Sequence, residues 1–265
     1  MRVAPAADIW KMVQGRRPKV EGPRGVKQPT FDFRLSTFDL QPRRFVVVLV
    51  VAMLGHAVAA VFYAHLVERE SLRSLVYFGS KIVVNAIPLV WVFVVARQPL
   101  RWPVVTWRGV VMGLVTGLVM GGGIVALYHA VFSGRIAVDA LLAKAGAYGA
   151  VNHFFLFAAF LCVGNSAMEE YYWRWFVYRG MREFMPPGPA VVISALGFTL
   201  HHVVVLSAYF PSVGMVLLLN VGVFVGGCVW AILYERFRGI AGPWISHALV
   251  DAAIMVVAYD LLFRV

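Results

Sequence analysis

The stretch FVVVLVVAMLGHAVAAVFYAHLV, residues 45–67, decides the fold class. It runs for 23 residues without an Asp, Glu, Lys or Arg, and about 20 mainly apolar residues are enough for a helix to cross the hydrocarbon core of a bilayer. The rest of the chain has the same character, since 61% of its residues are hydrophobic and only 14% are charged. We therefore expect an all-α, polytopic transmembrane helix bundle, integral to the membrane.

Seven stretches are long and apolar enough to be read as membrane spans. They are residues 45–67, 74–96, 109–132, 151–178, 188–206, 211–233 and 241–262. The fourth is too long, and too polar at its C-terminal end, to face lipid alone. The chain thus divides into a basic tail (1–44), three N-terminal spans (45–132) and a core of about four spans (150–262).

Positive charge is concentrated before the first span, where residues 1–44 hold ten of the 24 Lys and Arg residues. Such a segment can bind nucleic acid, but next to a membrane span it is better interpreted as a cytoplasmic tail lying against anionic lipid, with no nucleic-acid partner. With the tail inside, the tail and the inside loops hold 18 Lys and Arg residues and the outside holds five. This asymmetry obeys the positive-inside rule, and seven spans then place the C-terminus outside.

Glycines recur at intervals of four in two of the spans. Gly113, Gly117 and Gly121 form one series, and Gly222 and Gly226 form the other. Small residues at this spacing let helix backbones approach closely in lipid. We expect both series to pack helices together inside the bundle rather than to form a dimer interface.

The connection between the third and fourth spans, residues 133–150, contains Arg135, Asp139 and Lys144 among apolar residues. This composition fits an amphipathic helix lying at the membrane surface. It fits a loop equally well, and the sequence leaves both open.

Three polar motifs occur in the last four spans. They are Glu169-Glu170-x-x-x-Arg174, Phe198-x-x-x-His202 and His247-x-x-x-Asp251. Ionisable side chains inside a membrane are costly, so they face the bundle interior, pair with one another and mark functional sites. The motifs therefore predict a buried polar site.

Spacing within the motifs sets the geometry that we expect. Glu169 and Glu170 point about 100° apart on a helix, and Glu170 can pair with Arg174 four residues later, which leaves Glu169 available for chemistry. His247 and Asp251 likewise share one helix face. The side chains expected to converge in one cavity, open toward the cytoplasm, are Glu169, His202, His247 and Asp251.

A buried carboxylate beside imidazoles can activate water for hydrolysis. The carboxylate acts as a general base, and imidazole or amide donors stabilise the oxyanion of a tetrahedral intermediate. Each residue alone has a structural explanation, because a histidine in a membrane helix often only bonds a neighbouring helix and a Glu–Arg pair is often only structural. Their joint occurrence favours a hydrolytic site.

The three motifs, in this order, resemble those of the CPBP intramembrane proteases, which include type II CAAX prenyl endopeptidases and bacteriocin-processing proteins. The family pattern is Glu-Glu-x-x-x-Arg, Phe-x-x-x-His and His-x-x-x-Asn/Asp, and the similarity covers about residues 150–255. It implies an intramembrane endopeptidase in which Glu169 is the catalytic base and His202 orients or activates the water. It also implies that His247 and Asp251 form the oxyanion-stabilising side. The implied supporting residues are Glu170, Arg174 and Phe198.

No cofactor is expected, because the motifs lack the His-Glu-x-x-His spacing of zincins. The alternative is a zinc ion held by Glu169, His202, His247 and Asp251. An ionised Asp251 cannot donate a hydrogen bond as Asn can, so it must be protonated or have an orienting role. His201 lies beside His202 but outside the pattern.

The expected substrate is a membrane-associated or lipidated protein or peptide. Whether it is prenylated, and whether the protein forms oligomers, stays open. Two other classes remain, a catalytically inactive scaffold or immunity protein and an ion- or proton-coupled transporter. The absence of paired inverted halves argues against the transporter.

Overall fold

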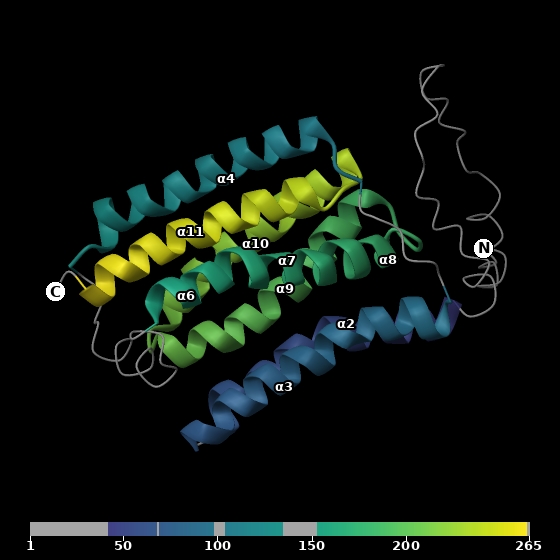
Figure 1. Cartoon of the computed structure of the whole chain (residues 1–265), viewed down its shortest axis with the longest axis horizontal. Helices are drawn as coiled ribbons and strands as arrows, with labels where there is room; N and C mark the ends of the chain where they lie inside the picture. Colours follow the sequence, from purple (N-terminus) through teal and green to yellow (C-terminus); the bar gives the residue numbers. More distant parts are fainter. Residues whose placement is uncertain (1–41, 68, 98–103, 135–152, 264–265) are drawn as a thin grey trace, which may run out of the picture.

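The computed structural model describes residues 42–67, 69–97, 104–134 and 153–263 (Figure 1). Within these residues the chain contains helices and no strand, which confirms the predicted fold class. Most of the basic tail and most of residues 133–150 lie outside the described residues. The elements, with η marking π-helical segments, are α2 (Pro42–Val61), η1 (Phe62–Leu66), α3 (Glu70–Leu89), η2 (Val90–Val95), α4 (Trp107–Leu127), η3 (Tyr128–Phe132), α6 (Phe154–Ala159), η4 (Phe160–Asn165), α7 (Ser166–Glu170), η5 (Tyr171–Tyr178), α8 (Arg179–Met181), α9 (Pro187–Tyr209), α10 (Val213–Phe237) and α11 (Ala241–Phe263).

Six of the seven predicted spans are long apolar helices of the kind that crosses a bilayer. They are Arg43–Leu66, Leu75–Val95, Trp107–Phe132, Pro187–Tyr209, Val213–Phe237 and Ala241–Phe263. Large apolar side chains such as Phe78, Ile82 and Leu118 are exposed on their outer faces. Because an apolar surface of this extent needs lipid around it, the protein is an integral, multi-pass membrane protein.

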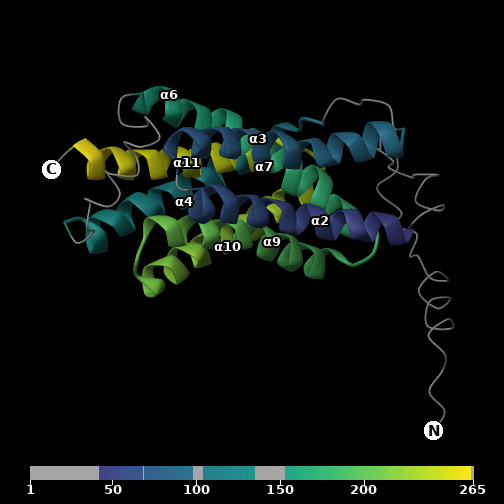
Figure 2. The ribbon, with the colours of Figure 1, turned by 90° about the horizontal axis from the view of Figure 1, so that it is seen from below.

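The fourth predicted span, 151–178, corresponds to the continuous helical run from α6 to α8. It is not one of the six long apolar helices, because the polar residues between positions 165 and 170 interrupt its apolar sequence. Its C-terminal part is enclosed by the bundle, because α7 contacts α11 and η5 contacts α2, α3, α9 and α10 (Figures 1 and 2). Its N-terminal part is more open, with Phe155, Leu156 and Val163 exposed. We call this run, residues 154–181, the central helix.

Aromatic packing holds the central helix in place. Tyr172, Trp173, Phe176 and Tyr178 of η5 are all buried in the main apolar core, and the Tyr172 hydroxyl donates to the carbonyl of Ala52 on α2 at 2.8 Å. The π-helical segments η4 and η5 flank α7, which carries the acidic pair. Such π-helical turns frequently occur at functional sites.

The first glycine series packs α4 against α11, as predicted. A Cβ at Gly117 would lie 2.9 Å from the Cα of Ser246, and one at Gly121 would lie 3.1 Å from the Cβ of Ala253. Neither distance leaves room for a larger side chain without movement of α11. In Figure 1 the two helices run side by side along one edge of the bundle.

The prediction for the second glycine series was wrong at Gly222, whereas Gly226 is buried. A Cβ at Gly222 would meet nothing within 4 Å, and one at Gly226 would meet Trp230 of the same helix. The close approach of α10 to α9 occurs at Gly227 instead, where a Cβ would lie 3.1 Å from the Cβ of Ala195. Spacing identifies a smooth helix face, but it does not determine whether a neighbouring helix lies against that face.

Candidate active site

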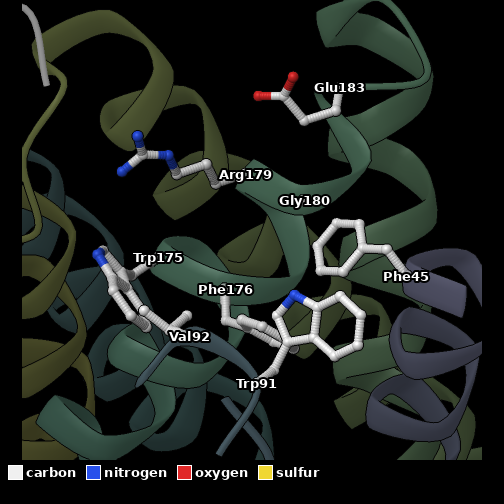
Figure 3. A pocket seen from close by; sticks show the side chains of 8 residues that line it. All are labelled: Phe45, Trp91, Val92, Trp175, Phe176, Arg179, Gly180 and Glu183. Atoms are coloured by element: carbon white, nitrogen blue, oxygen red, sulfur yellow. The ribbon is translucent and has the colours of Figure 1, made fainter. Parts of the chain in front are cut away.

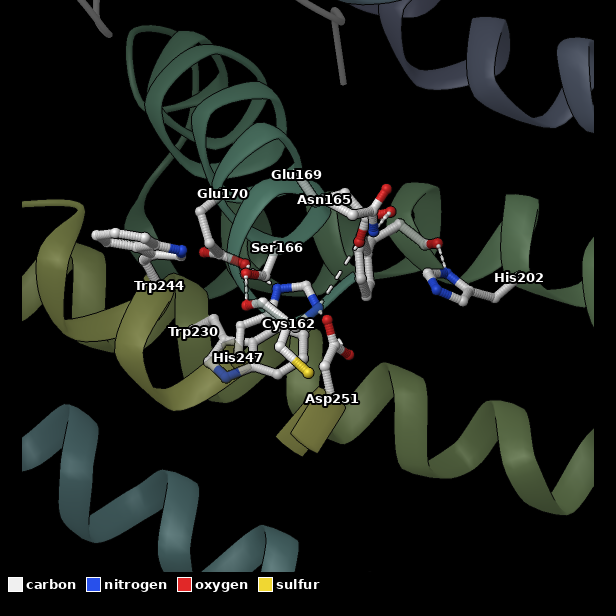
Figure 4. A network of polar contacts seen from close by, with 12 residues as sticks. Cys162, Asn165, Ser166, Glu169, Glu170, His202, Trp230, Trp244, His247 and Asp251 are labelled. Atoms are coloured by element: carbon white, nitrogen blue, oxygen red, sulfur yellow. Dashed lines mark hydrogen bonds and ion pairs between the residues drawn. The ribbon is translucent and has the colours of Figure 1, made fainter. Parts of the chain in front are cut away.

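Glu169 lies on α7, buried in the middle of the bundle. Its Oε1 accepts a hydrogen bond from Asn165 Nδ2 at 3.0 Å. The same oxygen is 3.9 Å from Lys81 Nζ and 4.0 Å from His201 Nε2. Its other oxygen, Oε2, is 3.7 Å from His247 Nε2 (Figure 4). The carboxylate is therefore surrounded by polar groups from α3, η4, α9 and α11.

Glu170 is fully buried and bonds two side chains through one oxygen. Its Oε1 accepts from Arg174 Nη1 at 2.9 Å, the pair expected from their spacing, and lies 2.8 Å from His247 Nδ1. Because a carboxylate oxygen only accepts, Nδ1 of His247 is the donor in this second bond. Arg174 also donates to the carbonyl of Gly227 at 3.3 Å, and its guanidinium lies 4.7 Å from the centre of the Phe198 ring. A second partner of Glu170 on α11 was not foreseen from spacing.

The His247 ring is held by stacking on one face and by a hydrogen bond at Nδ1. It stacks on Trp230, with ring centroids 3.8 Å apart and planes at 14°, and the Trp230 indole donates to Ser246 Oγ at 3.1 Å. With Nδ1 committed to Glu170, Nε2 faces Glu169 and lies 3.7 Å from Asp251 Oδ1. The third motif thus places an imidazole nitrogen between two carboxylates.

His202 enters the site from α9 together with its neighbour His201. His202 Nδ1 is 2.9 Å from the carbonyl oxygen of Phe198, and since a carbonyl only accepts, Nδ1 carries the proton. In a neutral ring Nε2 then has a free lone pair. One ligand-type atom from each of Glu169, His201 and His202 lies within 4.8 Å of the others. The structure thereby brings together all four side chains that the sequence proposed as catalytic.

Four residues around Glu169 were not assigned to the site from sequence. Asn165 is hydrogen-bonded to the Glu169 carboxylate at 3.0 Å, and Lys81 and His201 lie 3.9 Å and 4.0 Å from it. His56 on α2 is buried, with its ring centroid 5.4 Å from that of His201. A usable signal was present for two of them, because Lys81 and His56 are ionisable residues inside otherwise apolar spans.

One group among the described residues could converge on a metal ion. It consists of Glu169, His201 and His202, a carboxylate and two imidazoles of the kind that zinc accepts. It shares Glu169 and His202 with the alternative zinc set expected from sequence and contains His201 in place of His247 and Asp251. The Lys81 ammonium, 3.9 Å from Glu169 Oε1, disfavours a second cation at the same carboxylate.

A separate pocket opens near the start of α2 and contains none of these residues (Figure 3). Its empty volume, counted out to the solvent, is about 290 Å³. Four of the eight residues that line it are aromatic. The eight are Phe45, Trp91, Val92, Trp175, Phe176, Arg179, Gly180 and Glu183.

Comparison with known proteins gives a match to one family. The family model described as type II CAAX prenyl endopeptidase Rce1-like matches residues 151–253, which include all three polar motifs. Neither the curated proteins nor the solved structures give a match to this chain. The match covers residues 151–253 and confirms the resemblance to this family that the three motifs indicated.

Proposed function

We propose that this protein is an intramembrane endopeptidase that hydrolyses a peptide bond of a membrane-associated or lipidated protein or peptide. The observation that carries the proposal is the buried Glu169 carboxylate, within 4.8 Å of a ring nitrogen of His202 and 3.7 Å from His247 Nε2. The description of the matching family, an endopeptidase, supports the reaction class. The substrate class follows from the site's position inside an apolar bundle.

In the proposed mechanism, a water molecule lies between Glu169 and His202. Two hydrogen bonds of about 2.8 Å can bridge the gap of up to 4.8 Å between the Glu169 carboxylate and the His202 ring nitrogen. The carboxylate oxygen and Nε2 of His202 both accept hydrogen bonds. The water then donates both protons, and an oxygen lone pair is free to attack a peptide carbonyl carbon. Glu169 takes one proton as general base and returns it to the leaving amine as general acid.

The opposite side of the site is built to receive the oxyanion of the tetrahedral intermediate. His247 is held rigidly by Glu170 and Trp230. Because Nδ1 already donates a proton to Glu170, Nε2 donates in the doubly protonated, imidazolium form of the ring, and it does so in a fixed direction. Preorganised donors of this kind stabilise the transition state without reorganising during the reaction. Asp251, 3.7 Å from that nitrogen, orients the ring or shares its proton.

Glu169→Gln tests the proposal. The amide keeps the shape of the side chain but cannot take a proton, and loss of a positioned general base costs about 10²–10⁴-fold in rate. Quantitative proteomics of membranes should therefore show uncut proteins accumulating in the variant strain and not in the wild type. Glu183→Gln, outside the site, is the matched control and should resemble the wild type. Equal peptide profiles at matched protein levels would contradict the proposal and favour a non-catalytic scaffold.

A metal-assisted reaction is the second candidate, favoured by the convergence of Glu169, His201 and His202. A metal ion there would supply Lewis-acid activation of water. Under the preferred mechanism, a chelator leaves cleavage unchanged and elemental analysis of purified protein finds no stoichiometric metal. Loss of cleavage on chelation, restored by added zinc and abolished by His201→Ala, would establish the metal mechanism instead.

A further inference from the structure

A lysine from the N-terminal spans reaches the candidate active site. Lys81 lies on α3, outside the segment that matches the family model. Its Nζ donates a hydrogen bond to Asn165 Oδ1 and lies 3.9 Å from Glu169 Oε1. Its side chain is only 17% exposed, and the ammonium also lies 5.4 Å from the centre of the Tyr77 ring.

Asn165 transmits this contact to the carboxylate. Its amide oxygen accepts from Lys81, and its amide nitrogen donates to Glu169 Oε1 at 3.0 Å. The lysine, the amide and the carboxylate therefore form one connected unit. All of its contacts are to Oε1, so Oε2 remains directed at His247.

Among the described Lys and Arg side chains, Lys81 is the one that lies against Glu169, whereas a doubly protonated His247 shares its charge with Glu170 and Asp251. The titratable groups nearby are Glu170 and Arg174 on the central helix, His201 and His202 on α9, His247 and Asp251 on α11, and His56 on α2. Arg174 is bonded to Glu170 at 2.9 Å and stacked on aromatic rings. A buried carboxylate without a nearby cation tends to be protonated, and a protonated Glu169 could not act as a base.

We propose that Lys81 is a positioning residue of this site: its ammonium holds Asn165, keeps the Glu169 carboxylate ionised and directs Oε2 toward His247. The catalytic meaning of this role rests on the proposed function. It makes α3 part of the active site, although α3 lies outside the matched family segment.

Chemical labelling tests the proposal without a substrate. Dicyclohexylcarbodiimide is an apolar reagent that reacts with protonated carboxyl groups, and mass spectrometry identifies the modified residue. Near neutral pH, we expect little labelling of Glu169 in the wild type. Lys81→Met should raise that labelling about tenfold or more, because a cation at this distance favours the ionised carboxylate by about that factor. Lys81→Arg, which keeps the charge, should label as the wild type does.

Two controls separate charge from structure. Lys81→Gln keeps a donor for Asn165 but removes the charge, so it should label like Lys81→Met, and it replaces that variant if Lys81→Met does not fold. Glu235, paired with Arg182 at 3.3 Å, should show unchanged labelling in every folded variant. Equal Glu169 labelling in the wild type and the uncharged variants would overturn the proposal, as would strong labelling of the wild type itself.

The proteomic comparison then distinguishes this inference from the proposed function. Uncut proteins should accumulate with Lys81→Met and Lys81→Gln, and Lys81→Arg should restore their processing. Suppose that the Lys81 variants show the expected labelling of Glu169 but the membrane proteome of Glu169→Gln equals that of the wild type. That result would refute the protease function and would leave the role of Lys81 at Glu169 intact. The opposite result is a changed membrane proteome in Glu169→Gln with no change of Glu169 labelling in the Lys81 variants. It would refute only the role of Lys81 and would leave the protease function standing.

Discussion

Glu170 links two elements of the site through a single oxygen atom, which accepts from Arg174 on its own helix and from His247 on α11. Both bonds are buried, and both use the negative charge of the carboxylate. Charge-assisted hydrogen bonds are about twice as strong as neutral ones. Glu170 therefore contributes to the stability of the bundle and also fixes the orientation of His247.

Glu170→Gln should destabilise the protein more than Glu169→Gln does. Breaking a buried ion pair leaves the Arg174 charge uncompensated and costs about 3 kcal/mol or more, whereas Glu169 meets Lys81, His201 and His247 only at 3.7–4.0 Å. Thermal unfolding in detergent, followed by intrinsic Trp fluorescence, measures both variants against the wild type. A smaller shift of the unfolding temperature for Glu170→Gln than for Glu169→Gln would contradict this assignment.

At the scale of elements, the contact between α4 and α11 determines where His247 lies. Ser246 and Leu249 of α11 pack directly on Gly117 of α4, and Ser246 precedes His247 in the chain. The Thr116 hydroxyl donates to Ser246 Oγ at 3.0 Å, next to this contact. A change in the spacing of these two helices must therefore move the third motif relative to Glu169.

Gly117→Val should impair both packing and activity. The new side chain would overlap α11, because even its Cβ would lie 2.9 Å from the Cα of Ser246, and overpacking typically costs about 1–3 kcal/mol. The matched control is Gly122→Val on the same helix, where a Cβ meets nothing within 4 Å. The unfolding temperature measures the effect on packing, and the accumulation of uncut membrane proteins measures the effect on activity. Similar behaviour of the two valine variants would show that the α4–α11 contact is not limiting.

At the scale of the whole molecule, two spans outside the family match contribute to the site. Lys81 comes from α3 and His56 from α2, while the apolar residues of α2 form part of the core around η5. The N-terminal helices are thus structural components of the site rather than a separate membrane anchor.

The orientation in the membrane is predicted from the distribution of Lys and Arg, with the connection between α3 and α4 on the cytoplasmic side. Val105→Cys and Pro211→Cys, in a protein whose Cys162 and Cys228 are replaced, test opposite ends of the bundle, because both positions are exposed. In intact cells, a membrane-impermeant maleimide should label Pro211→Cys and should reach Val105→Cys only after permeabilisation. The reverse pattern would contradict the predicted orientation.

The sequence by itself determined the fold class, six of the seven spans to within four residues, and the resemblance that the family model matches over residues 151–253. These features are local: a run of apolar residues satisfies its own backbone as a helix wherever it lies in lipid. The pair Glu170–Arg174 is local too, because residues four apart share a helix face. Periodicity within one helix was therefore sufficient for all of them.

Only the tertiary structure decided which side chains from different helices meet. The bond from His247 to Glu170, the approach of Lys81 to Glu169 and the choice of Gly227 rather than Gly222 for the contact with α9 join residues far apart in the chain. Each depends on how a helix is rotated and placed against its neighbours. Packing of the whole bundle sets that rotation, because lipid and protein interiors are both apolar and hydrophobicity alone does not distinguish one apolar face from another.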